Sequence, residues 1–420
     1  MKKILVVASD LEIGGAERAL LGLLEAIDRQ KYQVDLFLLR HRGAFLKFFP
    51  EGVHLLPENP KYADLGIPIP EVLKKGHLDM VCGRIWGKYQ AKRFIKEHGL
   101  KKENSVQIHY SFRYTLPFLP MISEKWYDLA LGFTTPYYIV DQKVHAKSKA
   151  VWVHTDYEAL DGDRLEENSV WSAYPHIVSV SEAVTQSFLS VYPKLKDRMF
   201  LMENIVSENM IRRQAKMMDV SGEMPKEEGV FRLLSIGRFT GAKNFDQIPL
   251  ICQYLQKSGC NIRWYLIGFG DEEAKIRQNI RRYRMENRVI LLGKKENPYP
   301  YIKACDFYIQ PSRYEGKAVA VREAQILHKP VVITRFATAE AQVRDGVDGV
   351  IVTLDAKECA GGIAELIRDK KKQRELIQNC QRTVYSNAEE AKKLDELLEG
   401  SENGEGCKNQ CCGTGIQCGT

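Results

Sequence analysis

Residues 312–325 read SRYEGKAVAVREAQ, and the predicted elements of the chain are organised around this stretch. Glu315 and Glu323 stand eight positions apart in it, separated by a glycine, a lysine and a short apolar run. We expect Glu315 in a loop after a buried strand and Glu323 in the helix that follows, which begins near Lys317. The free N–H groups and positive dipole end of that helix favour an anion such as a diphosphate. A capped helix with a solvated glutamate is the alternative, since short motifs often arise by chance.

The second half of the chain alternates strands and helices around this stretch. The predicted strands are residues 231–236, 264–267, 289–292, 307–309, 331–333 and 350–352. Because strands that alternate with helices are typical of parallel sheets, we expect one parallel sheet here.

Cationic and glycine residues follow the first two of these strands. Arg238 and Lys243 can reach the same cleft as the two glutamates, where an arginine forks onto phosphate oxygens and a lysine supplies a point charge. A surface pair is the alternative. Gly268 and Gly270 would let a base or ribose approach the backbone, although a single G-x-G pattern is common. The two glutamates could bind hydroxyl groups on either side of a diphosphate, which is the layout of a nucleotide-sugar.

The first half opens with a similar unit. Residues 3–9 form an apolar, β-branched strand that runs into Gly14 and Gly15 and then into a helical pattern, the beginning of a βαβ unit. Such a turn lets a ligand approach a helix N-terminus, or it is a tight turn with no ligand. The full G-x-G-x-x-G fingerprint is missing, which argues against a nicotinamide cofactor. His154 directly follows the strand 149–153, at a position where open α/β sheets carry functional residues; a structural histidine is the alternative.

The sequence predicts two doubly wound α/β domains with Rossmann-like parallel sheets, facing each other across a cleft. A charged, methionine-rich segment with Gly222 and Pro225 separates them as a hinge. Residues 62–70 contain more than one proline and are expected to be a loop. An S-x-x-E capping box at 386–389 predicts the start of the last helix. The predicted parts are residues 1–206, the hinge 207–229, residues 230–385, the helix 386–400 and a tail 401–420.

Composition sets limits on the class of protein. The chain has 420 residues, of which 44% are hydrophobic and 27% charged, as in ordinary soluble proteins. No segment approaches the roughly 18 to 20 apolar residues of a membrane span, and the first residues lack a signal-peptide cleavage site. We therefore expect a cytoplasmic protein, in which six scattered cysteines are small buried hydrophobes. The Gly-rich tail, with a spacing that is not a standard zinc pattern, is expected to be disordered; its cysteines are Cys407, Cys411, Cys412 and Cys418.

A basic stretch at residues 74–114 is interleaved with aromatic residues. Ile85, Tyr89 and Phe94 beside lysines indicate an amphipathic surface, which could lie on an anionic membrane or bind an acidic or lipid-linked substrate. A solvated helix face is the alternative. Nucleic acid is a weaker interpretation, because no recognised nucleic-acid module accompanies the charge.

Taken together, six motifs resemble the retaining glycosyltransferases of family 4, which have the GT-B fold. The likeness covers roughly residues 1–400 and is most similar to bacterial enzymes that build capsular, exopolysaccharide or lipopolysaccharide chains. The motifs are GGAER (14–18), VWVHTDY (151–157), SVSEAV (179–184), SIGRF (235–239) with Lys243, LIGFGDEE (266–273) and EGKAVAVREAQ (315–325).

The resemblance implies a role for each matching residue. Residues 1–206 would be the acceptor side and residues 230–385 the nucleotide-sugar side. Glu315 would bind hydroxyls of the transferred sugar, Glu323 the ribose, and His154 the donor sugar, while Gly15, beside Gly14, would lie close to the phosphates or the acceptor. The donor diphosphate would be held by Arg238, Lys243 and the amides of Lys317, Ala318 and Val319. The usual E-G-F-G is E-G-K-A here, so the donor-sugar contact at Lys317 and Ala318 departs from the family pattern.

The implied activity is a retaining, metal-independent hexosyltransferase without a cofactor. It would move a hexose from a nucleotide-sugar, with UDP favoured, to a growing glycan or lipid-linked acceptor, by attack on the front face of the sugar. Cationic side chains and a helix N-terminus would take the place of a metal. Peripheral contact with the inner face of an anionic membrane is a further expectation, and no nucleic acid is expected. The alternatives are a GT-B nucleotide-sugar epimerase and a non-catalytic sugar-binding protein.

Overall fold

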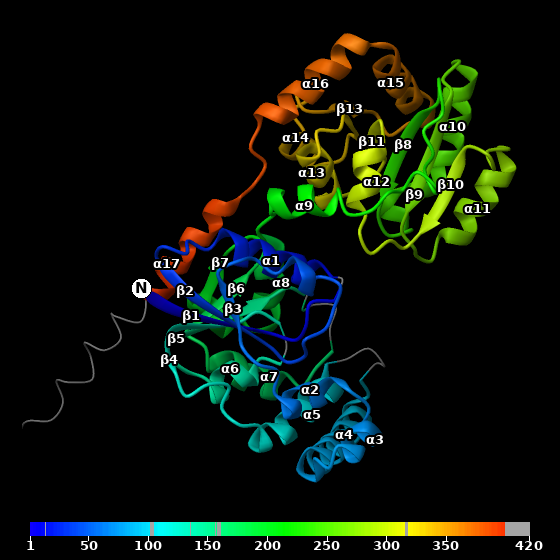
Figure 1. Cartoon of the computed structure of the whole chain (residues 1–420). Helices are drawn as coiled ribbons and strands as arrows, with labels where there is room; N and C mark the ends of the chain where they lie inside the picture. The colour runs from blue at the N-terminus through cyan, green and yellow to red at the C-terminus, as the bar shows by residue number, and fades with distance from the viewer. Residues whose placement is uncertain are drawn as a thin grey trace, which may run out of the picture. The chain divides into compact units, whose positions relative to one another are not determined.

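The computed structural model describes residues 1–12, 14–100, 105–134, 136–155, 157, 161–315 and 318–399. The chain divides into two compact units (Figure 1). The N-terminal unit comprises Met1–Val206 together with Asn387–Thr420, and the C-terminal unit comprises Ser207–Ser386. Residues 207–229, expected as a hinge, belong to the C-terminal unit and include helix α9 (Glu208–Gln214).

The N-terminal unit is built on a parallel sheet of seven strands in the order β3-β2-β1-β4-β5-β6-β7. Its register pairs Val6 with Leu36 of β2 and with Leu131 of β4. The strands read as almost continuous apolar runs because helices cover both faces of a parallel sheet. The strands are β1 (Lys2–Ala8), β2 (Tyr32–Leu38), β3 (Val53–Leu55), β4 (Trp126–Gly132), β5 (His145–Val153), β6 (His176–Ser179) and β7 (Met199–Leu201). The longer helices are α1 (Gly15–Ala26), α4 (Leu78–His98), α5 (Val106–Thr115), α7 (Arg164–Ser172) and α8 (Glu182–Val191).

The C-terminal unit has a parallel sheet of six strands in the order β10-β9-β8-β11-β12-β13. Buried hydrogen bonds tie its central strands together: Ser235 Oγ donates to the carbonyl of Ile309 (2.6 Å) and accepts from the Trp264 indole (2.9 Å). The strands are β8 (Phe231–Ile236), β9 (Ile262–Ile267), β10 (Val289–Gly293), β11 (Phe307–Gln310), β12 (Val331–Thr334) and β13 (Val350–Val352). The helices after α9 are α10 (Ile248–Lys257), α11 (Glu273–Arg282), α12 (Tyr299–Ala304), α13 (Val319–Ile326), α14 (Ala339–Gln342), α15 (Ala356–Arg368) and α16 (Lys370–Arg382). The prediction of two parallel-sheet α/β domains is confirmed.

Both sheets reverse their strand order beside the first strand. In the N-terminal unit the reversal lies between β1 and β4, and in the C-terminal unit between β8 and β11. Ligands of open α/β sheets bind outside the carboxyl ends of the strands at such a reversal. A ligand site is therefore expected in the loops after these four strands.

Two local predictions are wrong. Residues 62–70 were expected to be a loop, but they lie within or beside the short helices α2 (Pro60–Ala63) and α3 (Ile69–Lys74). Pro68 is the N-cap of α3 and Pro70 lies in its first turn, positions where a missing N–H costs nothing. The capping box at 386–389 predicts the start of the final helical segment correctly but its N-cap wrongly, because the N-cap is Asn387 and not Ser386. The final helical segment begins at Ala388 without a side-chain cap, and the N–H of Ser386 donates to Glu208.

The end of the described chain returns to the N-terminal unit. Helix α17 (Leu394–Glu399) is fixed there by Ser148, whose hydroxyl donates to the carbonyl of Leu397 (2.8 Å), and by Asp395, which binds Lys31 and Tyr32. Across the residues described, no helix combines the length and apolar character needed to cross a membrane.

Candidate active site

The loops after β8 and β11 interlock at the strand reversal of the C-terminal unit. The N–H groups of Arg313 and Tyr314 both donate to the carbonyl of Ala242, at 2.8 and 3.4 Å. The Arg313 guanidinium also donates to the carbonyl of Gly241 and forms an ion pair with buried Asp246. These bonds fix the two loops as one surface, so the side chains they carry have fixed relative positions.

Glu315 is the centre of this surface. It is only 6% exposed, and its Oε1 accepts hydrogen bonds from Lys243 Nζ (2.5 Å), Ser312 Oγ (2.6 Å) and Gln310 Nε2 (3.2 Å). Gln310 is oriented in turn by the buried Tyr308 hydroxyl, which donates to its Oε1 (2.7 Å). The other carboxylate oxygen, Oε2, has no hydrogen-bond partner within the described chain. The carboxylate is therefore held rigidly by one oxygen while the other can accept a hydrogen bond from a ligand.

Lys243 and Arg238 were predicted to act together, but the structure gives them different surroundings. Lys243 is ion-paired with Glu315, and its ammonium keeps two further protons for other acceptors. Arg238 is exposed, and its guanidinium makes no hydrogen bond or ion pair with the residues that the structure describes. Lys243 is thus part of the built site, whereas Arg238 is a free cation beside it. Their proposed binding of a diphosphate stays a prediction.

Helix α13 begins at Val319, close to its predicted start near Lys317; Lys317 itself lies outside the described residues. Ala318 is the N-cap and makes no side-chain cap. Its N–H is not open to a ligand, because it donates to Gln342 Oε1 (2.7 Å). Val319 is an exposed residue, and its first-turn N–H remains the better candidate for an anion.

Two polar residues that were not predicted hold both ends of the loop between Glu315 and α13 through hydrogen bonds. Thr338 Oγ1 donates to the carbonyl of Glu315 (2.7 Å), and Gln342 Nε2 donates to Thr338 Oγ1 (2.8 Å). Both follow β12, which pairs with β11, so their place at the same sheet edge was the available signal.

Glu323 lies on α13 and is 3% exposed. Its Oε1 accepts a hydrogen bond from the hydroxyl of Tyr299 (2.8 Å), a residue of α12 that the sequence reasoning did not select. The carboxylate is therefore positioned by a neighbouring helix. Its role at a ribose stays a prediction.

Gly268 and Gly270 have a structural role of their own. Both have φ of 151°, and a Cβ atom would lie 1.9 Å from the carbonyl oxygen of Gly237 at the first position and 2.6 Å from that of Phe239 at the second. Glycine is needed here so that the loops after β8 and β9 can touch. A contact with a base remains a prediction.

The strand reversal of the N-terminal unit joins the loops after β1 and β4. The N–H of Ser9 donates to Thr134 Oγ1 (2.8 Å), and the N–H of Phe133 donates to the carbonyl of Val7 (2.9 Å). Gly14 is the N-cap of α1 and Gly15 its first residue, and Gly14 provides no side-chain cap. A Cβ at Gly15 would meet no atom within 4 Å, so the first turn of α1 has open space beside it.

His154 lies directly after β5, next to this reversal. Its Nε2 is 2.9 Å from the carbonyl of Phe133, which can only accept, so Nε2 carries the proton. Nδ1 is buried and has no hydrogen-bond partner in the described chain. Burial lowers the pKa of His154 from 6.5 to about 4. The imidazole is therefore neutral near pH 7, and Nδ1 is a buried acceptor nitrogen.

Within the described ranges, no group of three or more His, Cys, Asp or Glu side chains could hold a metal ion. The six scattered cysteines are free thiols. Five of them are buried as predicted, but the prediction is wrong for Cys82, which is exposed. The four cysteines of the predicted tail lie outside the described residues.

The loops that carry Lys243 and Glu315 lie in a segment that matches a known family. Residues 220–383 match the family described as glycosyl transferases group 1. Among curated proteins, the amylovoran biosynthesis glycosyltransferase AmsD of Erwinia amylovora is 26% identical over 127 residues, 30% of this chain and 35% of that protein. The lipopolysaccharide core biosynthesis glycosyltransferase LpsE of Rhizobium meliloti is 24% identical over 168 residues, 40% of this chain and 48% of that protein. The chain thus spans between a third and a half of the length of these relatives.

Solved structures extend the likeness to both units. HepE of Anabaena, in complex with UDP, aligns with 97% of this chain and 100% of its own at a TM-score of 0.51 and 17% identity. TarM of S. aureus aligns with 95% of this chain and 100% of its own at a TM-score of 0.58 and 13% identity. The fold is GT-B. Within GT-B, the C-terminal unit carries the group 1 match, and its strand reversal carries the Glu315 and Lys243 pair.

Proposed function

We propose that this protein is a retaining hexosyltransferase that uses a UDP-sugar to extend a glycan or lipid-linked acceptor in surface polysaccharide synthesis. The observation that carries the proposal is the geometry of Glu315. One of its oxygens is fixed by Lys243, Ser312 and Gln310, and the other has no hydrogen-bond partner among the described residues. The family match of residues 220–383 and the names of AmsD and LpsE support the reaction class. The UDP complex of HepE supports the choice of nucleotide.

In this proposal the C-terminal unit binds the donor. The two remaining ammonium protons of Lys243, the guanidinium of Arg238 and the N–H of Val319 bind the diphosphate. They stabilise the negative charge that grows on UDP as it leaves, which is commonly the largest contribution to catalysis. Glu323 binds the ribose, and the open oxygen of Glu315 binds a sugar hydroxyl. No metal or cofactor is assigned a role.

The chemical step is a displacement on one face of the sugar. The bond between the anomeric carbon and the diphosphate oxygen breaks, and the acceptor oxygen forms a bond to the anomeric carbon from the same side. The acceptor proton passes to the departing phosphate oxygen, so UDP leaves with the proton and the configuration is retained. His154, neutral and with Nδ1 unpaired among the described residues, accepts a hydrogen bond from a donor-sugar hydroxyl.

The test is a panel of nucleotide-sugars with the purified full chain. Calorimetry measures UDP binding, and UDP release is followed with and without extracted polysaccharide acceptors. We expect UDP binding and release of UDP from a UDP-hexose. Binding of UDP without any turnover would instead support a sugar-binding protein, and conversion of one nucleotide-sugar into another would support an epimerase. Absence of both binding and turnover overturns the proposal.

A further inference from the structure

Helix α4 has two apolar faces. Its inner face carries Gly83 and Gly87 against α5. A Cβ on Gly83 would lie 2.5 Å from the carbonyl oxygen of Tyr114, and one on Gly87 would lie 2.6 Å from that of Tyr110. The two glycines therefore let the backbones of the two helices touch, and this face of α4 is fully used by packing within the unit.

The opposite face of α4 is apolar and exposed. Leu78, Ile85, Trp86 and Tyr89 are 60%, 54%, 52% and 57% exposed. Their spacing places them along one side of the helix, away from the side that packs on α5. The Trp86 and Tyr89 rings lie side by side, with centroids 5.6 Å apart. A soluble helix normally presents polar residues here, so this exposed stripe is expected to bind a partner.

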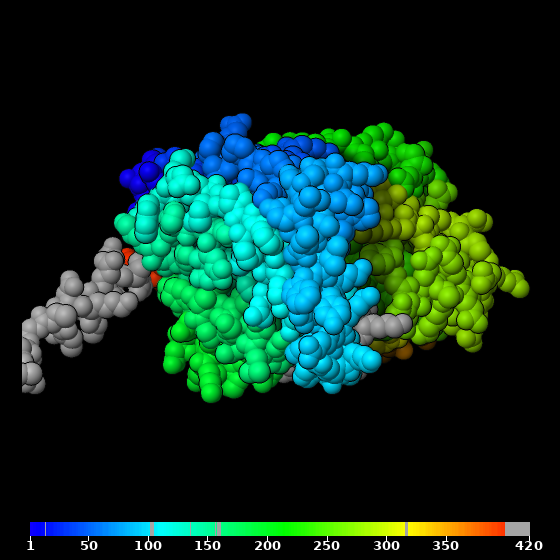
Figure 2. All heavy atoms as spheres, turned by 90° about the horizontal axis from the view of Figure 1, so that it is seen from below, coloured from blue at the N-terminus to red at the C-terminus, as the bar shows by residue number. Residues whose placement is uncertain are grey.

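The same part of the chain holds almost all of the excess positive charge. Residues 69–115 contain ten lysines and arginines but four aspartates and glutamates, a net charge of +6 in a chain whose total is +7. Lys88, Lys92 and Lys96 follow one another at four-residue intervals on α4. All three are exposed, and none forms an ion pair with a described residue. In Figure 2 this part of the chain, in light blue, forms one continuous surface of the N-terminal unit.

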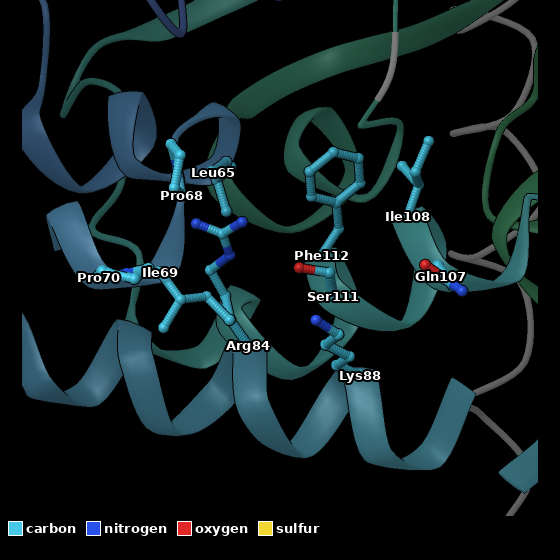
Figure 3. A pocket seen from close by; sticks show the side chains of 10 residues that line it. All are labelled: Leu65, Pro68, Ile69, Pro70, Arg84, Lys88, Gln107, Ile108, Ser111 and Phe112. Carbon is cyan, nitrogen blue, oxygen red and sulfur yellow. The ribbon is translucent and has the colours of Figure 1, made fainter. Parts of the chain in front are cut away.

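A pocket of about 480 Å³ lies beside this helix, between α3, α4 and α5 (Figure 3). Arg84 and Lys88 extend into it from α4, opposite Ser111 and Phe112 of α5. The guanidinium of Arg84 is held by the carbonyls of Asp64 (2.8 Å) and Ile67, whereas the Lys88 ammonium is free of described partners. Lys88 thus belongs both to the pocket and to the row of exposed lysines.

We propose that α4 docks on an anionic phospholipid bilayer. Leu78, Ile85, Trp86 and Tyr89 enter the interface between water and hydrocarbon, where aromatic side chains are favoured. The row of lysines contacts head-group phosphates, and the pocket at Lys88 receives one of them. A second copy of the chain fits this face less well, because a symmetric contact would bring two rows of lysines together. The inference is independent of the proposed glycosyltransferase activity.

Flotation with vesicles tests the contribution of charge. The full chain is mixed with vesicles of phosphatidylcholine alone or with phosphatidylglycerol added. We expect binding to the anionic vesicles and a loss of about tenfold or more when the row of lysines is reversed, since each cation contributes to binding at the surface. The test variant combines Lys88→Glu, Lys92→Glu and Lys96→Glu. A control with the same change in charge alters exposed cations of α16 and should bind as the native protein does; it combines Lys371→Glu, Arg374→Glu and Arg382→Glu.

The apolar stripe is tested by a second pair of variants. Ile85→Ser with Trp86→Ser should also abolish flotation. The control, Trp126→Ser with Leu165→Ser, removes a tryptophan and an aliphatic residue that are even more exposed (66% and 87%) elsewhere in the same unit, and it should retain flotation. Far-UV circular dichroism and thermal unfolding of every variant report whether the chain is folded. UDP binding, measured separately, reports whether the proposal about the donor holds.

Tryptophan fluorescence locates the contact. The chain has five tryptophans, and Trp152, Trp171 and Trp264 are at most 2% exposed. In a Trp126→Phe background, quenching by acrylamide therefore reports on Trp86. Anionic vesicles should shift this emission to the blue and protect it from acrylamide. Binding without such a change, or undiminished flotation of the Lys88 triple variant, overturns the proposal. So would a lipid-free dimer that the Ile85 and Trp86 double variant abolishes, since that result assigns the face to a second copy.

Discussion

The strand reversals of the two units carry opposite kinds of chemistry. In the C-terminal unit, the carboxylate of Glu315 is buried and receives three hydrogen bonds on one oxygen, one of them from an ammonium. In the N-terminal unit, His154 makes one hydrogen bond through Nε2, and burial keeps its pKa at about 4, so it is neutral near pH 7. The first arrangement suits a ligand that changes charge, and the second suits one that needs only a neutral acceptor.

Removing the Glu315 carboxylate is expected to have the largest effect on the proposed reaction. Glu315→Ala should lower kcat by about 10²–10³-fold, the usual cost of removing one preorganised polar group from the site of charge development. UDP binding should change little, because the predicted contact of this carboxylate is with the sugar. Steady-state rates with saturating donor measure the effect. Glu340→Ala is the matched control, since Glu340 is an exposed glutamate that pairs only with Arg335 among described residues. An equal loss of kcat in Glu340→Ala would contradict a specific role of Glu315 in the reaction.

Arg238 and Lys243 should differ in their effects on UDP binding and on stability. Arg238→Ala should weaken UDP binding by about 10- to 150-fold, since a charge-assisted contact to phosphate is worth roughly 1.5–3 kcal/mol. It should leave Tm unchanged because the side chain is exposed. Lys243→Met should weaken UDP binding and also lower Tm, because it leaves the buried Glu315 with two donors rather than three. Calorimetry and thermal unfolding on both variants check this. Equal Tm losses in the two would show that Arg238 is also structural.

The sequence predicted which residues lie at the carboxyl edge of each sheet, but it did not predict the hydrogen bonds and ion pairs among their side chains. Apolar β-branched runs identified the parallel strands, and residues directly after a strand end could be assigned to one edge of the sheet. This placed Lys243 and Glu315 near each other but did not reveal that they form an ion pair. Thr338, Gln342 and Tyr299 were missed because they are ordinary polar residues more than 20 positions from the residues that they position.

Helix α4 illustrates a different limit. The sequence showed apolar residues beside lysines, but it could not tell which face would be buried. Phe94 was grouped with Ile85 and Tyr89, yet it packs against buried Tyr110, whereas the other two are exposed. Glycines that allow helix contact decided the outcome, since Gly83 and Gly87 turn their own side of α4 toward α5.

Gly268 and Gly15, one in each unit, should differ in how much an alanine substitution changes the free energy of unfolding. Gly268→Ala should destabilise the C-terminal unit by about 1–3 kcal/mol, because the new Cβ would meet the carbonyl oxygen of Gly237 at 1.9 Å and the φ of 151° is strained for alanine. Gly15→Ala should leave stability unchanged or slightly raise it, since its Cβ would meet no atom within 4 Å. Urea unfolding, monitored by far-UV circular dichroism, measures both. A destabilising Gly15→Ala would mean that packing, rather than open space for a ligand, explains that glycine.

The smallest effect concerns the neutral state of His154. Its pKa in the folded protein is about 4, below its ordinary value of 6.5, because burial disfavours the charged ring. Between these two values the unfolded chain binds a proton that the folded chain refuses, so the free energy of unfolding falls as the pH is lowered through this window. His154→Asn removes that difference and should reduce the loss of stability between about pH 7.5 and pH 5 by on the order of 1 kcal/mol. Urea unfolding at both pH values measures it, with His98→Asn, an exposed histidine on α4, as the control. Parallel pH dependence in the native and His154→Asn proteins would show that the ring is not held neutral, and the contrast with Glu315 would then rest on geometry alone.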